Sequence, residues 1–229
     1  MPKNSRTRQF PSVLINFYAR AFFKTHDFEG YALAFLNEQT NELHLKVLYA
    51  GCAGSGKTTN LQSLYKQTSP ELSSRLFDLH EVARKNQFFD FLPMSLGQSR
   101  AHALRLHVYT LPSHDLWRSV VMNLAWGVDG VVFVLDSRVR ALQENEQQLM
   151  RLKSILKCVN RNFDEIPLVF QYNQRDAPDA LPLRAMKTEY TRTAAAEIEG
   201  VAVQDIGVVE TVEALSDRIL ANMESPRFM

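Results

Sequence analysis

The chain has 229 residues, of which 45% are hydrophobic and 22% charged, a composition typical of a folded globular domain. It excludes a disordered or collagen-like chain. The 26 basic and 25 acidic residues leave a formal net charge of +1 and are dispersed, so we expect no nucleic-acid partner. The two cysteines, Cys52 and Cys158, are far apart in sequence and indicate a reducing compartment, the cytoplasm.

Residues 1–42 are predicted to form an N-terminal extension with one or two strands. They lack a helical period and contain short apolar segments at 13–18 and 31–35. Polar residues interrupt the apolar stretch that follows Phe10, and no later run approaches the ~20 apolar residues that span a bilayer. We therefore expect neither an export signal nor a membrane span, and we expect the aromatic side chains of the extension to pack.

From residue 43 to 229, short apolar runs alternate with amphipathic stretches, which predicts βαβ units and a mainly parallel sheet. The predicted strands are 45–50, 88–92, 103–109, 131–135, 168–172 and 201–203, and the predicted helices lie near 61–65, 117–124, 149–159, 183–196 and 209–219. The strands at 88–92 and 103–109 are expected to form an antiparallel hairpin whose turn contains Gly97. The fold class is therefore α/β, with a doubly wound sheet.

The segment Gly51–Thr58, which follows the first buried strand, reads GCAGSGKT and matches the phosphate-binding loop pattern in full. Glycines let backbone N–H groups surround phosphate oxygens at a helix N-terminus, Lys57 reaches the terminal phosphates, and the Thr58 hydroxyl binds Mg²⁺. The fold is thus predicted to be a P-loop NTPase. The expected phosphate-binding residues are Gly51, Cys52, Ala53, Gly54, Ser55, Gly56, Lys57, Thr58 and Thr59.

A second polar segment, Asn173-Gln174-Arg175-Asp176, follows the predicted strand at 168–172. It lies at the carboxyl end of a parallel strand, where open α/β sheets bind ligands. A carboxylate such as Asp176 accepts both the ring N–H and the exocyclic amine of guanine, a pair of donors that adenine lacks. Beside a phosphate-binding loop, this segment favours guanine over adenine.

The sequence resembles the Ras-like small GTPases, and among them the bacterial gliding-motility GTPases of the MglA type. The likeness covers about residues 43–220 and rests on the segments KTTNLQ from Lys57, FFDFLP from Phe88, GVDGVVFV from Gly127 and QYN from Gln171. The resemblance implies binding of GTP and GDP with Mg²⁺, slow hydrolysis, and a role in cell polarity or motility. It also implies protein effectors or a GTPase-activating partner at the switch loops, here residues 80–93 and 110–118.

Several positions depart from the family pattern. Thr110-Leu111-Pro112 is followed by Ser113 and His114 where the family has glycine and a water-positioning glutamine. The resemblance makes His114 the candidate for orienting water, and places Lys85, or its neighbour Arg84, where the family supplies an arginine in cis. Gln174 replaces a lysine of the guanine motif, and Ala202 lies in the last base-contacting loop, after Val201 in place of serine.

Other residues are expected to be structural. The histidine spacing fits no zinc signature, so we expect no transition metal. Asp136, at a strand end, is interpreted as structural, and Cys52 as a packing residue inside the loop. The predicted function is a guanine-nucleotide switch with weak hydrolysis. Two alternatives stay open: a pseudo-GTPase acting as a non-catalytic adaptor, and, as third choice, a P-loop ATPase or kinase.

Overall fold

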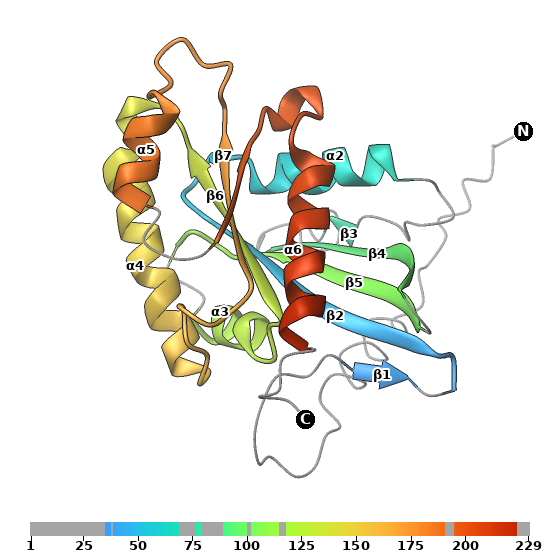
Figure 1. Ribbon diagram of the computed structural model, residues 1–229. Helices are drawn as coiled ribbons and strands as arrows, with labels where there is room; N and C mark the ends of the chain where they lie inside the picture. The colour runs from blue at the N-terminus through green and yellow to red at the C-terminus, as the bar shows by residue number, and fades with distance from the viewer. Residues whose placement is uncertain are drawn as a thin grey trace, which may run out of the picture. The chain divides into compact units, whose positions relative to one another are not determined.

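The computed structural model describes residues 35–37, 39–68, 77–78, 89–99, 102–114, 118–190 and 195–223. In these residues the strands form one sheet in the order β3-β4-β5-β2-β6-β7-β8, with β1 paired to β2 (Figure 1). The strands are β1 Phe35–Asn37, β2 Glu42–Ala50, β3 Phe77–Asp78, β4 Asp90–Ser99, β5 His102–Thr110, β6 Gly130–Asp136, β7 Leu168–Asn173 and β8 Ala196–Glu199. The helices are α2 Lys57–Gln67, α3 Arg118–Ala125, α4 Leu142–Cys158, α5 Leu183–Tyr190 and α6 Val208–Met223, with 3₁₀ turns η2 Val139–Ala141 and η3 Ala202–Gln204.

The sheet is mixed, with a parallel centre. Strand β2 pairs in parallel with β5 on one side and β6 on the other, and β6, β7 and β8 continue the parallel part. Strands β4 and β5 are antiparallel, as are β3 with β4 and β1 with β2. Parallel neighbours joined by helices and one antiparallel hairpin confirm the predicted doubly wound α/β fold.

Helices cover both faces of the sheet (Figure 1). Leu48 of β2 and Phe133 of β6 pack with buried residues of α3 and α4 on one face. Val47 and Val132, each the preceding residue, pack with residues of α2 and α6 on the other face. Successive side chains of a strand point to opposite faces, so a strand covered on both faces has no polar side. Accordingly, every residue of β6 is buried.

Three predicted elements differ from the structure: a turn, a strand and the end of a helix. Gly97 does not form the hairpin turn, because β4 continues through it to Ser99; the pairing with β5 shifts between Ser95 and Gln98, and Gly97 has φ +81° within that irregularity. The predicted strand at 201–203 is also wrong. The strand is β8, paired with β7, while 202–204 form a 3₁₀ turn in which Val203 is 74% exposed. The strand was predicted at 201–203 because that run is more apolar than β8, which carries two glutamates.

The helix predicted near 183–196 ends as α5 at Tyr190, so its predicted end is wrong as well, and β8 already begins at Ala196.

The predicted N-terminal extension is only partly described. Strand β1 lies within it and pairs with the start of β2. The expected strand at 13–18 and most of the segment 31–35 lie outside the described residues, so the boundary between extension and domain stays a prediction.

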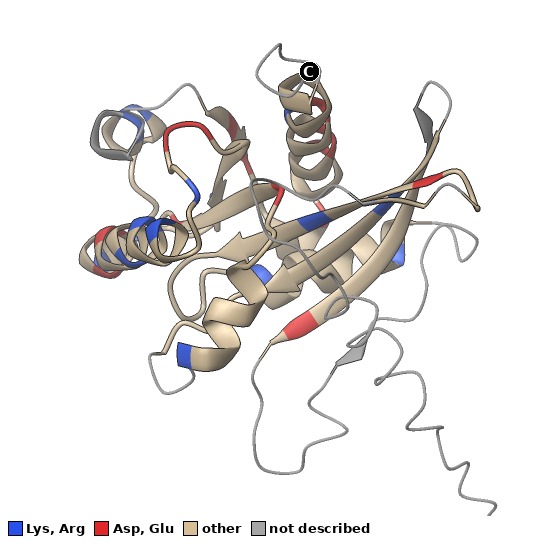
Figure 2. Cartoon of the chain, turned by 90° about the horizontal axis from the view of Figure 1, so that it is seen from below, with Lys and Arg blue, Asp and Glu red and all other residues tan. Residues whose placement is uncertain are grey.

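Charged residues of both signs occur along α4 and α6 (Figure 2). Neither these nor any other helix in the described residues combines the length and the apolar character needed to cross a membrane.

One buried histidine makes a specific stability prediction. His107 of β5 is buried, contacts His44 with 2.8 Å between Nε2 and Nδ1, and stacks on Phe91. Burial first, and then the neighbouring His44, Lys46 and Arg105, lower the pKa of His107 from 6.5 to about 4. A histidine whose pKa is lower in the folded chain than in the unfolded chain makes its full contribution to stability above pH 6.5. This contribution is lost as the pH falls from 6.5 towards 4.

We therefore expect acidification from pH 7 to 4.5 to cost roughly 2 kcal/mol of folding free energy through this residue, and His107→Gln to remove that part of the loss. The measurement is the free energy of unfolding in urea at both pH values. Asp129, whose pKa burial raises to about 6, titrates in the same range, but it is present in both proteins and cancels in the comparison. His102→Gln, at the start of β5, is the matched control. An equal acid-induced loss in wild type and His107→Gln contradicts the assignment.

Candidate functional site

The loop between β2 and α2 packs directly against the ends of β6 and β7. Gly51 has φ +142°, and a Cβ there would lie 2.2 Å from the backbone oxygen of Val134 in β6. Gly56 has φ +101°, and a Cβ there would lie 2.1 Å from Nδ2 of Asn173, the last residue of β7. Only glycine fits these two positions. The loop is followed at once by α2, so it presents a helix N-terminus, where anions are favoured.

Lys57, the first residue of α2, folds its ammonium group into this loop. Its Nζ donates to the backbone oxygens of Gly51 and Cys52, at 2.9 and 2.8 Å, and to Oγ of Ser113 at 2.9 Å. Burial, the largest effect, lowers the pKa of Lys57 to about 8, and the nearby Asp90 and Glu144 oppose this shift. The lysine is therefore still mainly a cation at neutral pH, and it lies where a phosphate would need a counter-charge.

Oxygen atoms from three elements meet beside the start of α2. The Thr58 hydroxyl donates to Oδ2 of Asp90 on β4 at 2.5 Å, and the Thr110 hydroxyl at the end of β5 donates to the same oxygen at 3.1 Å. Asp90 is buried, and its backbone N–H donates to the Thr110 hydroxyl at 2.7 Å. Hydroxyl and carboxylate oxygens are the donor set that Mg²⁺ prefers, so these residues fit the cation expected at Thr58.

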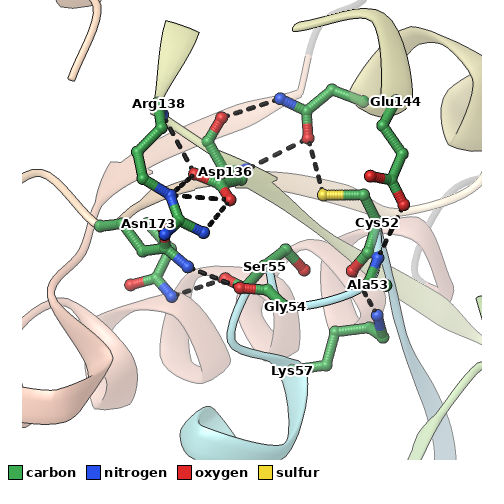
Figure 3. A network of polar contacts seen from close by, with 11 residues as sticks. Cys52, Ala53, Gly54, Ser55, Lys57, Asp136, Arg138, Glu144 and Asn173 are labelled. Atoms are coloured by element: carbon green, nitrogen blue, oxygen red, sulfur yellow. Dashed lines mark hydrogen bonds and ion pairs between the residues drawn. The ribbon is translucent and has the colours of Figure 1, made fainter. Parts of the chain in front are cut away.

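Asn173 joins three parts of the site that are distant in sequence, and Figure 3 shows its contact with Ser55. Its Nδ2 donates to the backbone oxygen of Ser55 at 2.8 Å, and its Oδ1 accepts from the backbone N–H of Ala202 at 2.9 Å. Gln174, with φ +62°, donates from Nε2 to the backbone oxygen of Gly54 at 2.6 Å. The structure therefore brings the predicted phosphate loop, the 173–176 segment and Ala202 together.

Asp176 is exposed, and in the described residues its carboxylate makes no hydrogen bond or ion pair. It follows Asn173 by three residues, at the carboxyl end of β7, so it stays available to a ligand in this loop. Thr59 lies in the first turn of α2, half-buried, one residue after Thr58. The predicted binding residues of both loops thus lie at one edge of the sheet.

Comparison with curated proteins gives one informative relative. The chain is 35% identical over 195 residues to the mutual gliding-motility protein MglA of Myxococcus xanthus, an alignment that covers 84% of this chain and 98% of the relative. The chain belongs to the MglA-type small GTPases. No profile of a known protein family matches it. Guanine-nucleotide binding follows from membership, and the family predicted from the sequence is confirmed.

In this MglA-type GTPase, the segment after β5 lies against both the phosphate loop and α4. Ser113 is bonded to Lys57, whereas the His114 side chain is exposed and the backbone oxygen of His114 accepts from Nη2 of Arg151 at 3.2 Å. His114 is thus next to the site in sequence, and its catalytic role stays a prediction. Lys85 and Arg84 lie outside the described residues.

The MglA-type site also has a buried polar support that the sequence did not reveal (Figure 3). Asn145 of α4 accepts from the Cys52 thiol at 3.4 Å and from the backbone N–H of Asp136 at 3.1 Å, and donates to the backbone oxygen of Asp136 at 2.8 Å. The Asp136 carboxylate is paired with Arg138, with a shortest distance of 2.5 Å. The interpretation of Asp136 as structural agrees with these contacts.

Burial, aided by Glu144 and Asp136, raises the pKa of the Cys52 thiol to about 11. The thiol is therefore protonated at neutral pH and unsuited to nucleophilic work, consistent with its predicted packing role. Glu144 accepts from the Ala53 N–H at 3.2 Å, so α4 contacts the phosphate loop at a second point. No sequence signal pointed to Asn145 or Glu144, because the helix prediction rested on the apolar residues of α4.

Proposed function

We propose that this MglA-type GTPase is a guanine-nucleotide switch of cell polarity or gliding motility in a bacterium, acting in the cytoplasm. The observation that carries the proposal is Asn173, which contacts the phosphate loop through Ser55 and the last loop through Ala202. A residue that holds the phosphate-binding and base-binding segments together fits a site built for a nucleotide. The motility role rests on the name of the relative, a mutual gliding-motility protein.

In the proposed complex, the phosphate loop and Lys57 bind the phosphates, Thr58 with the adjacent Asp90 carboxylate holds Mg²⁺, and Gln174, Asp176 and Ala202 surround the base. Magnesium neutralises phosphate charge when bound. Asp90 keeps the Thr58 hydroxyl in place through the 2.5 Å hydrogen bond. Protein effectors or a GTPase-activating partner would bind at 80–93 and 110–118. Of the described residues in these ranges, 90–93 lie on β4, Thr110 ends β5, and 111–114 follow β5 beside the site.

We expect Asp176→Asn to abolish the preference for guanine. An amide cannot accept from both guanine donors as a carboxylate does, and hydrogen bonds to charged groups are stronger than neutral ones. The measurement is competition of GTP and ATP against labelled GDP, with a loss of GTP affinity of roughly 10- to 100-fold in the variant. Asp179→Asn changes another exposed carboxylate of the same loop and should have no effect. If ATP competes as well as GTP with the wild-type protein, the proposed function is wrong.

A second candidate function is a pseudo-GTPase that binds nucleotide as a non-catalytic adaptor. The contact of Ser113 with Lys57 favours it, because a side chain lies where the family has glycine. The first candidate assigns slow hydrolysis to His114 and to Lys85 or Arg84. A single-turnover measurement with bound GTP decides between them: hydrolysis above the uncatalysed rate supports the switch, and none supports the adaptor.

A further inference from the structure

The ammonium group of Lys57 has all of its donors engaged by the protein itself. A lysine carries three N–H donors. Two of them go to the phosphate loop, at the backbone oxygens of Gly51 and Cys52, and the third goes to Oγ of Ser113 at 2.9 Å. The Ser113 hydroxyl in turn donates to the Gly51 oxygen at 3.3 Å. Ser113 therefore connects the segment after β5 both to the Lys57 ammonium group and to the Gly51 oxygen of the phosphate loop.

The backbone around Ser113 is fixed by α4. Gln148 donates from Nε2 to the Ser113 oxygen at 3.1 Å, and Arg151 donates from Nη1 to the Pro112 oxygen at 2.7 Å and from Nη2 to the His114 oxygen at 3.2 Å. At the other end of the segment, the Leu111 N–H donates to the Tyr49 oxygen of β2 at 2.8 Å. The Ser113 hydroxyl is thus held against Lys57 by the surrounding chain rather than by its own contact alone.

We propose that Ser113 determines the nucleotide preference of this protein by favouring GDP over GTP. The inference rests on the proposed function. A phosphate-loop lysine contacts the β- and γ-phosphates, while the loop amides bind the α- and β-phosphates. The Lys57 donor that points away from the loop carbonyls, towards the segment after β5, is the one bonded to Ser113. A γ-phosphate oxygen must displace the Ser113 hydroxyl from this donor, whereas GDP has no third phosphate that requires it.

Two variants distinguish the effect of the Ser113 hydroxyl from the effect of its Cβ. Ser113→Ala removes the hydroxyl and keeps the Cβ, and Ser113→Gly removes both. We expect Ser113→Ala to raise the affinity for GTP relative to GDP by about tenfold, the size of one charge-assisted hydrogen bond. We expect Ser113→Gly to add little to this gain. Ser154→Ala, which removes an exposed serine hydroxyl bonded to the Met150 oxygen on α4, is the control.

The experiment is calorimetric titration of the whole 229-residue chain, freed of nucleotide, with GDP and with a non-hydrolysable GTP analogue, both with Mg²⁺. A tenfold rise in the affinity ratio for Ser113→Ala, and none for Ser154→Ala, supports the proposal. An unchanged ratio for Ser113→Ala overturns it, whether or not Ser113→Gly improves GTP binding, and so does a fall in the ratio, which would make Ser113 a donor to the γ-phosphate. Wild-type protein that binds neither nucleotide contradicts the proposed function and this inference with it, whereas wild-type binding with an unchanged variant ratio contradicts the inference alone.

Discussion

Replacing Lys57 with alanine should lower the affinity for GDP and for GTP by roughly 100- to 1000-fold, because phosphate oxygens then lose their direct counter-charge in a partly buried loop. The measurement is equilibrium binding of fluorescent GDP in the presence of Mg²⁺. The loss should affect both nucleotides, since the β-phosphate is common to them. This distinguishes Lys57, which acts on all phosphate binding, from Ser113, which acts on the difference between the two nucleotides.

The matched control is Lys66→Ala, which removes an exposed lysine from the last turn of the same helix. It should leave binding unchanged. Thermal unfolding of nucleotide-free Lys57→Ala should stay close to wild type, because the lysine bonds only to two loop carbonyls and one hydroxyl in the described structure. Nucleotide affinity of Lys57→Ala within threefold of wild type would show that the loop does not bind phosphate through this residue.

The second large effect is on folding. Gly51→Ala should destabilise the protein by more than about 4 kcal/mol, because its Cβ would lie 2.2 Å from a backbone oxygen of the central strand β6, at φ +142°. Neither β6 nor the loop can move without disrupting the buried sheet. The measurement is the free energy of unfolding in urea, or the yield of soluble protein if the variant fails to fold.

Gly54→Ala provides the comparison within the same loop. Gly54 also has a positive φ, +72°, but a Cβ there meets no atom within 4 Å. Its cost should therefore be only the backbone strain of about 1 kcal/mol. Equal stability of the two variants would show that the contact with β6 does not restrict position 51.

The sequence predicted the parts of the site whose chemistry requires particular residues in a row. The phosphate loop is readable because its glycines, lysine and threonine are adjacent, and 173–176 is readable because it follows a buried strand. Asp90 and Asn145 were not assigned to the site, because their roles depend on how β4 and α4 pack against the loop. Asp90 meets Thr58 only because β4 pairs with β5, whose end supplies Thr110.

The fold, like the site, was predicted only where the local sequence decides the structure. Buried strands such as β6 were predicted because they are continuous runs of branched apolar residues. Strand β8 was missed because it alternates alanine, glutamate, isoleucine and glutamate, a pattern typical of an edge strand with one solvent-exposed face. The β4 bulge at Gly97 was read as a turn, since an isolated glycine indicates either. Local sequence does not distinguish these cases, because partner strands decide them.

The two hydrogen bonds of Asn173 have an entropic consequence for ligand association. They fix the loop after Gly200 and the phosphate loop at one mutual orientation in the protein without ligand. Ordering flexible segments during association costs free energy, and a cradle that is already ordered avoids most of that cost. The nucleotide therefore meets a pre-organised cradle, and the affinity gained in this way comes from a residue that needs no contact with the phosphates at all.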